Sequence, residues 1–268
     1  MSLLTVVTVV KDDESGLRNT LTSLDSQDSR DFTILVLDGS TDRNSVPSIL
    51  ATFPDLLTVY RWAEPSGVYG AMNQALNDVV APYTYFLNAG DELASTDVLA
   101  RAHEALQPTM PTWAFGRVLF FSETGAPLTE SPWSYPSERK RLFARGFFPA
   151  HQGVIVATEE LRRQGGFDLD YLVAADYASI LKCSITSDPL ELGFALAVFR
   201  QGGLSTTQWR RSLHEFHRAR RSIFRPAGKA ALLEQCDTWR VQLKTHAYHA
   251  ITALRIPRRR KDSTNTKG

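Results

Sequence analysis

The sequence contains few cysteines and no long apolar run. Cys183 and Cys236 are the only cysteines in 268 residues, too few for a disulfide framework or a thiolate metal site, which favours a reducing compartment. No stretch approaches the roughly 20 apolar residues that a membrane-spanning helix needs. The apolar residues 3–10 are interrupted by Thr5 and Thr8 and followed by charged residues, which predicts a strand rather than a signal peptide. We therefore expect a protein that starts out in the cytoplasm.

Two common nucleotide-binding signatures are also missing. The glycine-bearing loop at residues 64–73 lacks the G-x-G-x-x-G spacing, and no segment fits G-x-x-x-x-G-K-[ST], which argues against an NAD enzyme and a P-loop ATPase. A nucleotidyltransferase would carry a glycine-rich basic loop after the first strand, but residues 11–14 are mainly acidic. No recognisable motif for reading nucleic acid is present, so we expect no nucleic-acid partner.

The net charge of +1 hides an imbalance between two parts of the chain. Residues 201–268 carry 15 Lys/Arg against 4 Asp/Glu, a net of +11, while residues 1–200 carry 15 against 25, a net of −10. Helical patterns at residues 209–225 and 230–254 combine this positive charge with apolar residues. The two helices either pack on the body and expose a solvated cationic face, or attach the protein to an anionic membrane surface on the inner side of the cell membrane.

The first third of the chain alternates between strand and helix patterns. Short β-rich runs at residues 3–10, 32–37, 57–60 and 83–87 are separated by helical patterns at residues 16–27, 42–53 and 69–80. This alternation predicts an α/β fold of Rossmann type, in which a mostly parallel sheet is flanked by helices and ligands bind at the carboxyl ends of the strands.

The rest of the chain is less regular. We expect further strands at residues 113–121, 153–157 and 191–200, further helices at residues 95–106, 158–164 and 177–183, and a long Pro- and Ser-rich loop at residues 123–137. We divide the chain into a main domain at residues 1–207, a basic helical extension at residues 208–256, and a tail at residues 257–268 that is predicted to be disordered.

Carboxylates follow two strands at the predicted ligand edge of the sheet. Asp38 directly follows the second run, where its oxygens can accept hydrogen bonds from a base or a ribose; a turn with Ser40 or Asp42 as helix cap is the alternative. Asn88 and Asp91 follow the fourth run, where an oxygen ligand can hold Mg²⁺ or Mn²⁺; a turn that caps the next helix is again the alternative.

Two further segments are candidates for chemistry. The loop at residues 64–73 leads into a helix whose N-terminal N–H groups could face an anion; a plain loop with a tight turn is the alternative. Asp176 stands before a helix, where it could take a proton as a general base or simply cap the helix.

Taken in order, these segments resemble inverting family 2 glycosyltransferases of the GT-A fold, particularly bacterial enzymes of colanic-acid and related exopolysaccharide assembly. The resemblance is carried by residues 5–12, 38–42, 64–73, 86–91, 150–152, 166–168, 175–177 and 202–207. It implies a GT-A-like main domain that binds a nucleotide sugar, with UDP favoured, and transfers the sugar with inversion to a hydroxyl of a glycan or lipid-linked saccharide in cell-surface polysaccharide assembly.

The resemblance also implies residue roles. The nucleotide and sugar would be bound by Thr8, Lys11, Asp12, Asp38, Ala71, Met72, Asn73 and Asn88. Asp91 resembles the last acid of the family's Asp-x-Asp metal motif, which would hold Mn²⁺ or Mg²⁺, and Asp176 resembles the base. His151 and Gln152 resemble a pair on the acceptor and diphosphate side, although His151 could equally be a structural histidine.

Two positions depart from the family pattern. Asn88 and Gly90 stand where many members carry acids, which leaves Asp91 as the one strong metal ligand in that loop. Lys11 replaces an aromatic residue or arginine. The main alternative is therefore a catalytically weak or inactive glycan-binding or assembly subunit. The hypothesis of sugar transfer requires that Asp38, Asp91 and Asp176 converge on one cleft.

Overall fold

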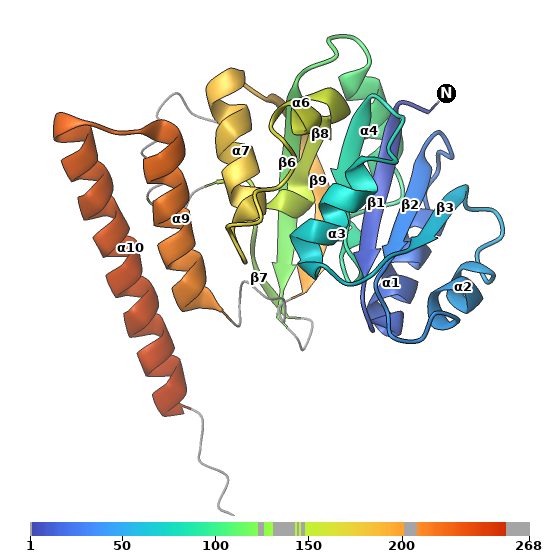
Figure 1. Cartoon of the computed structure of the whole chain (residues 1–268), viewed down its shortest axis with the longest axis horizontal. Helices are drawn as coiled ribbons and strands as arrows, with labels where there is room; N and C mark the ends of the chain where they lie inside the picture. Colours follow the sequence, from blue (N-terminus) through green and yellow to red (C-terminus); the bar gives the residue numbers. More distant parts are fainter. Residues whose placement is uncertain are drawn as a thin grey trace, which may run out of the picture.

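A single sheet of nine strands forms the centre of the computed structural model, which describes residues 2–122, 126–130, 143, 145, 148–200 and 208–255 (Figure 1). Eight strands follow the order β3 (Thr58–Trp62), β2 (Thr33–Asp38), β1 (Leu4–Val10), β4 (Tyr83–Phe86), β8 (Val154–Ala157), β6 (Trp113–Phe121), β9 (Leu190–Arg200) and β5 (Glu92–Leu93). The ninth strand, β7 (Pro127–Glu130), pairs with β6.

The first four strands of the chain form the parallel half of the sheet that the alternating pattern predicts. Strand β1 pairs in parallel with both β2 and β4, and β2 pairs in parallel with β3. All seven residues of β1 are buried, because helices cover both faces of such a sheet. The strands therefore end along one edge, and β2 ends on Asp38 itself.

The second half of the sheet is mixed. Strand β8 is antiparallel to both β4 and β6, while β9 runs parallel to β6 and antiparallel to β5. The α/β class is confirmed, but the parallel arrangement is confined to the first four strands and the β6–β9 pair. The parallel half ends where β8 enters the sheet directly beside β4 in the opposite direction.

Helices on the two faces of the sheet bury two apolar clusters. Alternate residues of β1 point to opposite faces, so Val6 lies in one cluster and Val7 in the other. Helices α1 (Glu14–Asp25) and α4 (Val98–Leu106) cover the face of Val6. The face of Val7 packs against α3 (Gly67–Leu76) and α7 (Ala175–Thr186). Short helices α2 (Ser45–Leu50), η1 (His151–Gly153) and α6 (Thr158–Arg163) complete the body.

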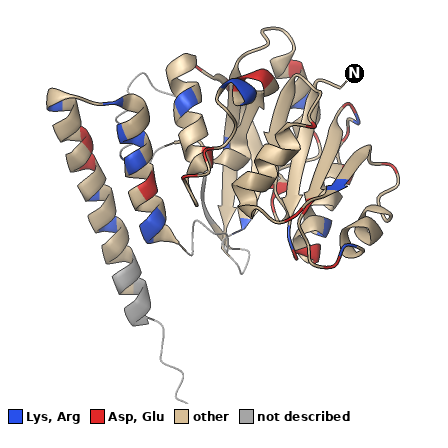
Figure 2. Ribbon diagram, in the orientation of Figure 1, with Lys and Arg blue, Asp and Glu red and all other residues tan. Residues whose placement is uncertain are grey.

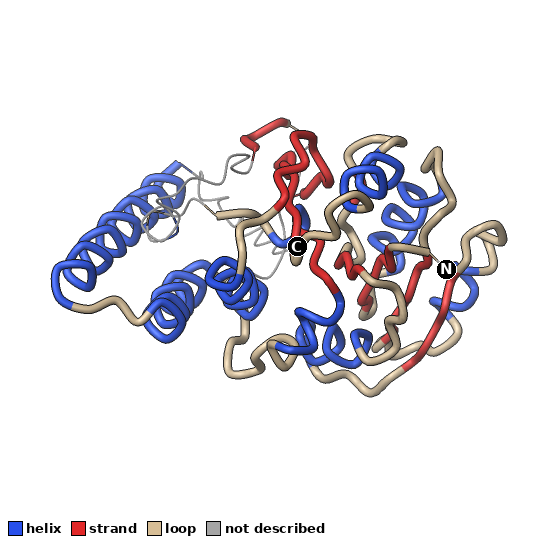
Figure 3. The backbone as a smooth tube through the Cα atoms, turned by 90° about the horizontal axis from the view of Figure 1, so that it is seen from above, coloured by secondary structure: helices blue, strands red, loops and turns tan. Residues whose placement is uncertain are grey.

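Two helices after the sheet form a basic hairpin at the opposite end of the molecule from the N-terminus (Figures 1 and 2). They are α9 (Trp209–Phe224) and α10 (Gly228–Arg255), close to the expected bounds. Helix α9 lies beside α7, and α10 lies on its outer side (Figure 3). Arg220 of α9 is 4% exposed and donates hydrogen bonds to Glu234 and Thr238 of α10.

Some predicted segments lie outside the described residues, namely residues 202–207, most of the loop at residues 123–137, and the tail at residues 257–268. The division into a main domain and an extension stays a prediction. Within the described part of the chain, none of the helices has both the length and the apolar character needed to cross a membrane.

Candidate active site

Two cavities adjoin at the edge where the parallel strands end. The first, here the Asp176 cavity, has a volume of about 420 Å³. The second, the Asp38 cavity, has a volume of about 390 Å³. Val68, Asn88 and Ala89 line both. Asp91 and Asp176 line the first cavity and Asp38 lines the second, so the three carboxylates lie around two adjoining cavities.

Asp38 is fully buried at the end of β2. Its Oδ1 accepts a hydrogen bond from the backbone N–H of Ser40 at 2.7 Å, and its Oδ2 accepts one from the hydroxyl of Tyr60 at 3.0 Å. Burial and the contact with Asp38 raise the pKa of Tyr60 to about 12, so that hydroxyl remains a donor. Lys11, Ala71 and Asn88 line the same cavity, which brings four of the predicted nucleotide-binding residues together.

Thr8 and Asp12 line neither cavity, and their side chains form hydrogen bonds with the protein backbone instead. The hydroxyl of Thr8, which is fully buried, donates a hydrogen bond to the carbonyl oxygen of Leu87 at 2.8 Å. The carboxylate of Asp12 accepts a hydrogen bond from the backbone N–H of Thr41 at 2.7 Å. Both side chains have internal partners, so their contacts with a nucleotide stay predictions.

Asn73 also has a partner within the protein. Its amide donates to the carbonyl oxygen of Phe167 at 2.8 Å and accepts from the N–H of the same residue at 2.7 Å. A β-carbon at the neighbouring Gly166 would lie 2.4 Å from the Asn73 oxygen, and Gly166 has a φ of +74°. Asn73 therefore holds a glycine turn against α3, whereas Met72 beside it lines the Asp176 cavity.

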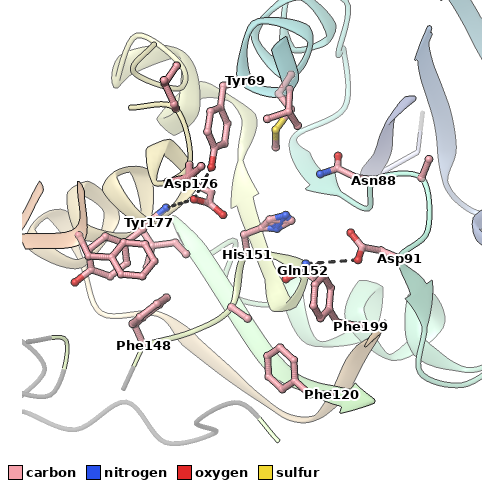
Figure 4. A pocket seen from close by; sticks show the side chains of 18 residues that line it. Tyr69, Asn88, Asp91, Phe120, Phe148, His151, Gln152, Asp176, Tyr177 and Phe199 are labelled. Carbon is pink, nitrogen blue, oxygen red and sulfur yellow. Dashed lines mark hydrogen bonds between the residues drawn. The ribbon is translucent and has the colours of Figure 1, made fainter. Parts of the chain in front are cut away.

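Asp176 lies in the first turn of α7 and lines the cavity named after it. Its Oδ1 accepts hydrogen bonds from the hydroxyl of Tyr69 at 2.9 Å and from the N–H of Tyr177 at 2.7 Å (Figure 4). Among the described residues, its Oδ2 takes part in no hydrogen bond. Burial and the Asp176 carboxylate raise the pKa of Tyr69 far above its ordinary value. Tyr69 therefore keeps its proton and holds one oxygen of the Asp176 carboxylate by a hydrogen bond.

Asp91 is a buried carboxylate that is expensive to ionise. It is 6% exposed, and burial raises the pKa of its carboxyl to about 7. Gln152 Nε2 donates to Asp91 Oδ1 at 3.5 Å, which is at the weak end of the range for a hydrogen bond. The hydroxyl of Thr20 donates to the backbone carbonyl of Asp91 at 2.7 Å. The loop is thus held firmly, while the Asp91 carboxylate receives only a long hydrogen bond from the Gln152 side chain and stays costly to ionise.

Two further polar atoms at this cavity are buried without a partner. Asn88 Oδ1 and His151 Nδ1 make no hydrogen bond in the described structure. Burial lowers the pKa of His151, with the Asp176 charge acting in the opposite direction, so the ring is neutral at physiological pH. Because buried polar atoms are almost always satisfied in proteins, these two favour a polar ligand between Asn88, Asp91 and His151.

The residues present fit a divalent cation that arrives with a phosphate ligand. In the described part of the chain, no three His, Cys, Asp or Glu side chains gather into a metal cage. Mg²⁺, however, is commonly bound through one or two carboxylates together with substrate phosphates. The Asp91 carboxylate and the unpaired Asn88 oxygen line the same cavity and are oxygen ligands of this kind.

Sequence reasoning missed two features of the site. Tyr69 lies inside the segment 64–73 that carried the resemblance, so its hydroxyl could have been considered from the sequence. The aromatic wall formed by Phe148, Tyr177 and Phe216 was missed as well, because only Tyr177 lies in a segment that carried the resemblance. Their rings come from three separate segments, and the ring centroids of Phe148 and Phe216 both lie 4.5 Å from that of Tyr177.

Comparison with known proteins gives one family match. The model of the family "Glycosyl transferase family 2" matches residues 5–154. An uncharacterised glycosyltransferase of Mycobacterium tuberculosis is 29% identical over 208 residues, which cover 75% of this chain and 76% of the relative. A PGL/p-HBAD biosynthesis glycosyltransferase of the same species is 29% identical over 168 residues, covering 61% of this chain and 62% of the relative.

Solved structures resemble the chain over most of its length. The mannosyltransferase PcManGT from Pyrobaculum calidifontis, in complex with GDP-Man and Mn²⁺, superposes with a TM-score of 0.65 at 20% identity, covering 94% of this chain and 75% of that one. Residues 1–349 of S. aureus TarS, in complex with UDP, give a TM-score of 0.64 at 15% identity, covering 90% and 71%. The chain spans 39% of the longer TarS chain.

Proposed function

The chain belongs to glycosyl transferase family 2 and has the GT-A-like α/β fold that the resemblance implied, and from this premise we propose that it transfers a sugar with inversion from a nucleotide sugar to a hydroxyl. The acceptor is a glycan or a lipid-linked saccharide. One observation carries the proposal: the predicted base Asp176 and the predicted metal ligand Asp91 line a single cavity that adjoins the Asp38 cavity.

The donor spans both cavities. The nucleoside occupies the Asp38 cavity, and the diphosphate crosses the shared wall at Asn88 and Ala89, so that the sugar reaches the Asp176 cavity. Lys11 at the mouth of the Asp38 cavity supplies a positive charge toward the nucleotide. UDP is the favoured nucleotide, which is supported by the UDP complex of the TarS structure, while the PcManGT complex holds GDP-Man.

Asp91 and Asn88 would hold Mn²⁺ or Mg²⁺ in this arrangement. When bound, the cation stabilises the negative charge on the departing diphosphate. The ligand also offsets the unfavourable burial of these oxygens, because it gives Asn88 Oδ1 the partner that the protein does not provide and puts positive charge beside the buried Asp91 carboxylate. His151 and Gln152 lie on the same cavity and hydrogen-bond the diphosphate or the acceptor.

Asp176 acts as the general base. The acceptor oxygen forms a bond to the anomeric carbon as the bond from that carbon to the diphosphate oxygen breaks, and the electron pair leaves on the diphosphate. The proton of the acceptor hydroxyl passes to Asp176 Oδ2, while Tyr69 and the N–H of Tyr177 hold Oδ1. A single displacement inverts the anomeric configuration, since no second carboxylate acts as a nucleophile.

The exposed face of α10 supports action at an anionic membrane surface. Leu232, Trp239 and Leu243 are 69%, 57% and 71% exposed, and their spacing of seven and four places them on one side of the helix. Glu234 on the other side is held by Arg220 of α9. Lys229 and Lys244 of the same helix are exposed as well, and Lys and Arg residues occur along both α9 and α10 (Figure 2). A helix binds an anionic bilayer surface when its apolar side chains insert among the lipids and its basic side chains are attracted to the lipid headgroups.

Attachment to a membrane is tested by sedimentation with liposomes. We expect pelleting with phosphatidylglycerol-containing liposomes and little with phosphatidylcholine alone, and Leu243→Glu should reduce it. The matched control is Leu57→Glu. Leu57 is equally exposed, at 69%, but it lies just before β3, the edge strand at the other end of the sheet from the helical hairpin. Equal pelleting with both lipids, or equal loss in both variants, contradicts the membrane proposal.

Cell-surface glycan assembly is the setting that the relatives support, because one of them is named for PGL/p-HBAD biosynthesis. Sugar transfer itself is tested by release of UDP or GDP from a panel of nucleotide sugars with Mn²⁺ and a saccharide acceptor. Asp176→Asn should bind the donor and lose turnover, and Asp91→Asn should lose both metal dependence and turnover. Donor binding without turnover by the unmodified protein would instead favour a glycan-binding or assembly subunit.

A further inference from the structure

Helix α9 touches the segment that leads to Asp176, and both follow the residues that the family model matches. Glu215 of α9 is 6% exposed. Its Oε1 accepts a hydrogen bond from the backbone N–H of Leu172 at 3.2 Å, and its Oε2 accepts one from the N–H of Val173 at 2.9 Å. One buried carboxylate therefore holds two consecutive backbone groups.

The two backbone groups belong to the chain immediately before α7. Ala174 is the N-cap residue of α7 and makes no side-chain capping hydrogen bond. Val173 is itself 5% exposed, so its N–H needs a partner within the protein. Hydrogen bonds from N–H groups to a carboxylate are stronger than those to a neutral oxygen. Glu215 thus fixes where the chain enters the first turn of α7, in which Asp176 lies.

The same helix also holds the residue that follows Asp176. The ring of Phe216 lies 4.5 Å from the ring of Tyr177, and Arg220 donates a hydrogen bond to the Tyr177 hydroxyl at 3.2 Å. Tyr177 in turn donates its N–H to Asp176 Oδ1. Helix α9 therefore contacts the chain on both sides of Asp176. Glu215 binds the two N–H groups before it, and Phe216 and Arg220 contact Tyr177 after it.

We propose that Glu215 is a positioning residue for the transfer reaction: by binding the N–H groups of Leu172 and Val173 it sets the direction in which the Asp176 carboxylate enters the cavity. Leu172, Val173 and Asp176 all line that cavity, so a shift of this segment moves both the base and the wall beside it. The inference rests on the proposed function of Asp176 as base.

Removal of the carboxylate should separate catalysis from donor binding. Glu215→Ala leaves two backbone N–H groups without their acceptor, and the segment shifts. Because a misplacement of about 1 Å can reduce a rate by roughly 100-fold, we expect kcat to fall by about 10- to 100-fold. The donor is bound mainly from β1, β2 and α3, so its Kd should change less than about threefold. Glu215→Gln keeps one carbonyl acceptor and should recover part of the rate.

Glu160→Ala is the matched control. Glu160 is 7% exposed and its carboxylate is paired with Arg163 at 2.7 Å, but it lies on α6 and lines neither cavity. Donor-binding stoichiometry from calorimetry gives the folded fraction, and kcat is expressed per binding site. The control should lose stability and keep its kcat, whereas Glu215→Ala should lose kcat. An equal kcat per site in the two variants, or no recovery with glutamine, would overturn the proposal.

Hydrogen exchange provides a readout that does not depend on activity. Glu215→Ala should accelerate exchange in the peptide that contains residues 172–177 and leave α3 unchanged, while Glu160→Ala should leave residues 172–177 unchanged. Unaltered exchange at residues 172–177 in Glu215→Ala overturns the positioning role even if no sugar donor is turned over. Accelerated exchange without turnover in the unmodified protein would instead count against the proposed function alone.

Discussion

Replacing Asp91 by asparagine is expected to stabilise the metal-free protein at high pH. Burial raises the pKa of the Asp91 carboxyl from 3.8 to about 7. The unfolded chain releases this proton near the ordinary value, so between the two pKa values the folded protein binds a proton that the unfolded chain has lost. The folded state therefore loses stability as pH rises from about 4 to 7, and the loss is complete above the folded-state pKa.

The magnitude follows from the difference of about three pKa units, which corresponds to roughly 4 kcal/mol when the carboxylate is fully ionised. At pH 5 less than half of this loss is present, and at pH 8 all of it is. The amide in Asp91→Asn does not ionise and still offers an oxygen to Gln152. Its advantage in the free energy of unfolding should therefore grow by about 2.5 kcal/mol between pH 5 and pH 8.

Urea denaturation followed by circular dichroism, with EDTA present, measures this difference at each pH. Any effect of the substitution that does not depend on pH cancels when the two pH values are compared. Saturating Mn²⁺ with UDP should then stabilise the unmodified protein more than the variant, because the ligand binds the ionised carboxylate of the native state. An advantage of Asp91→Asn that stays constant from pH 5 to pH 8 would refute the reasoning.

Three other substitutions test separate contacts. Tyr69→Phe removes the hydroxyl that donates to Asp176 and should lower kcat by about tenfold, with donor affinity from calorimetry unchanged; an unaltered kcat would show that Tyr69 does not orient the base. Asn73→Ala removes both hydrogen bonds to the Phe167 backbone and should reduce the free energy of unfolding by about 2 kcal/mol in urea. A loss near zero would show that the turn at Gly166 is stable without Asn73. Arg220→Ala leaves the 9%-exposed Glu234 without the arginine that pairs with it. The free energy of unfolding in urea should fall by about 3 to 5 kcal/mol. A loss below about 1 kcal/mol, as for exposed ion pairs, would contradict a buried Arg220–Glu234 pair.

The parallel half of the sheet could be predicted from the sequence because its signals are local. Strands β1, β2 and β4 are apolar runs of the right length, and helical patterns separate them. Strands β6 and β8 were also recognised as strands. Their directions and neighbours could not be, because β8 joins β4 and β6 across long stretches of chain, and nothing in a strand's own residues states which strand it will pair with.

The candidate site shows the same contrast. Asp38, Asp91 and Asp176 were identified from short motifs at the ends of strands or the start of a helix, and all three line the adjoining cavities. The contacts that orient them were not identified, because Tyr69 and Asp176 are 107 residues apart. Binding of the nucleotide sugar by Asn73 stays a prediction, and within the protein its amide is paired with Phe167. A short motif identifies a candidate residue, but it does not show which distant group that side chain will contact.

The central claim is that the two cavities form one donor site with the diphosphate at their shared wall. A crystal structure of the protein with UDP and Mn²⁺, with anomalous data to locate the metal, tests it directly. We predict the uridine in the Asp38 cavity, and the diphosphate and Mn²⁺ beside Asn88 and Asp91. UDP bound elsewhere, or Mn²⁺ located away from Asp91, would contradict the account.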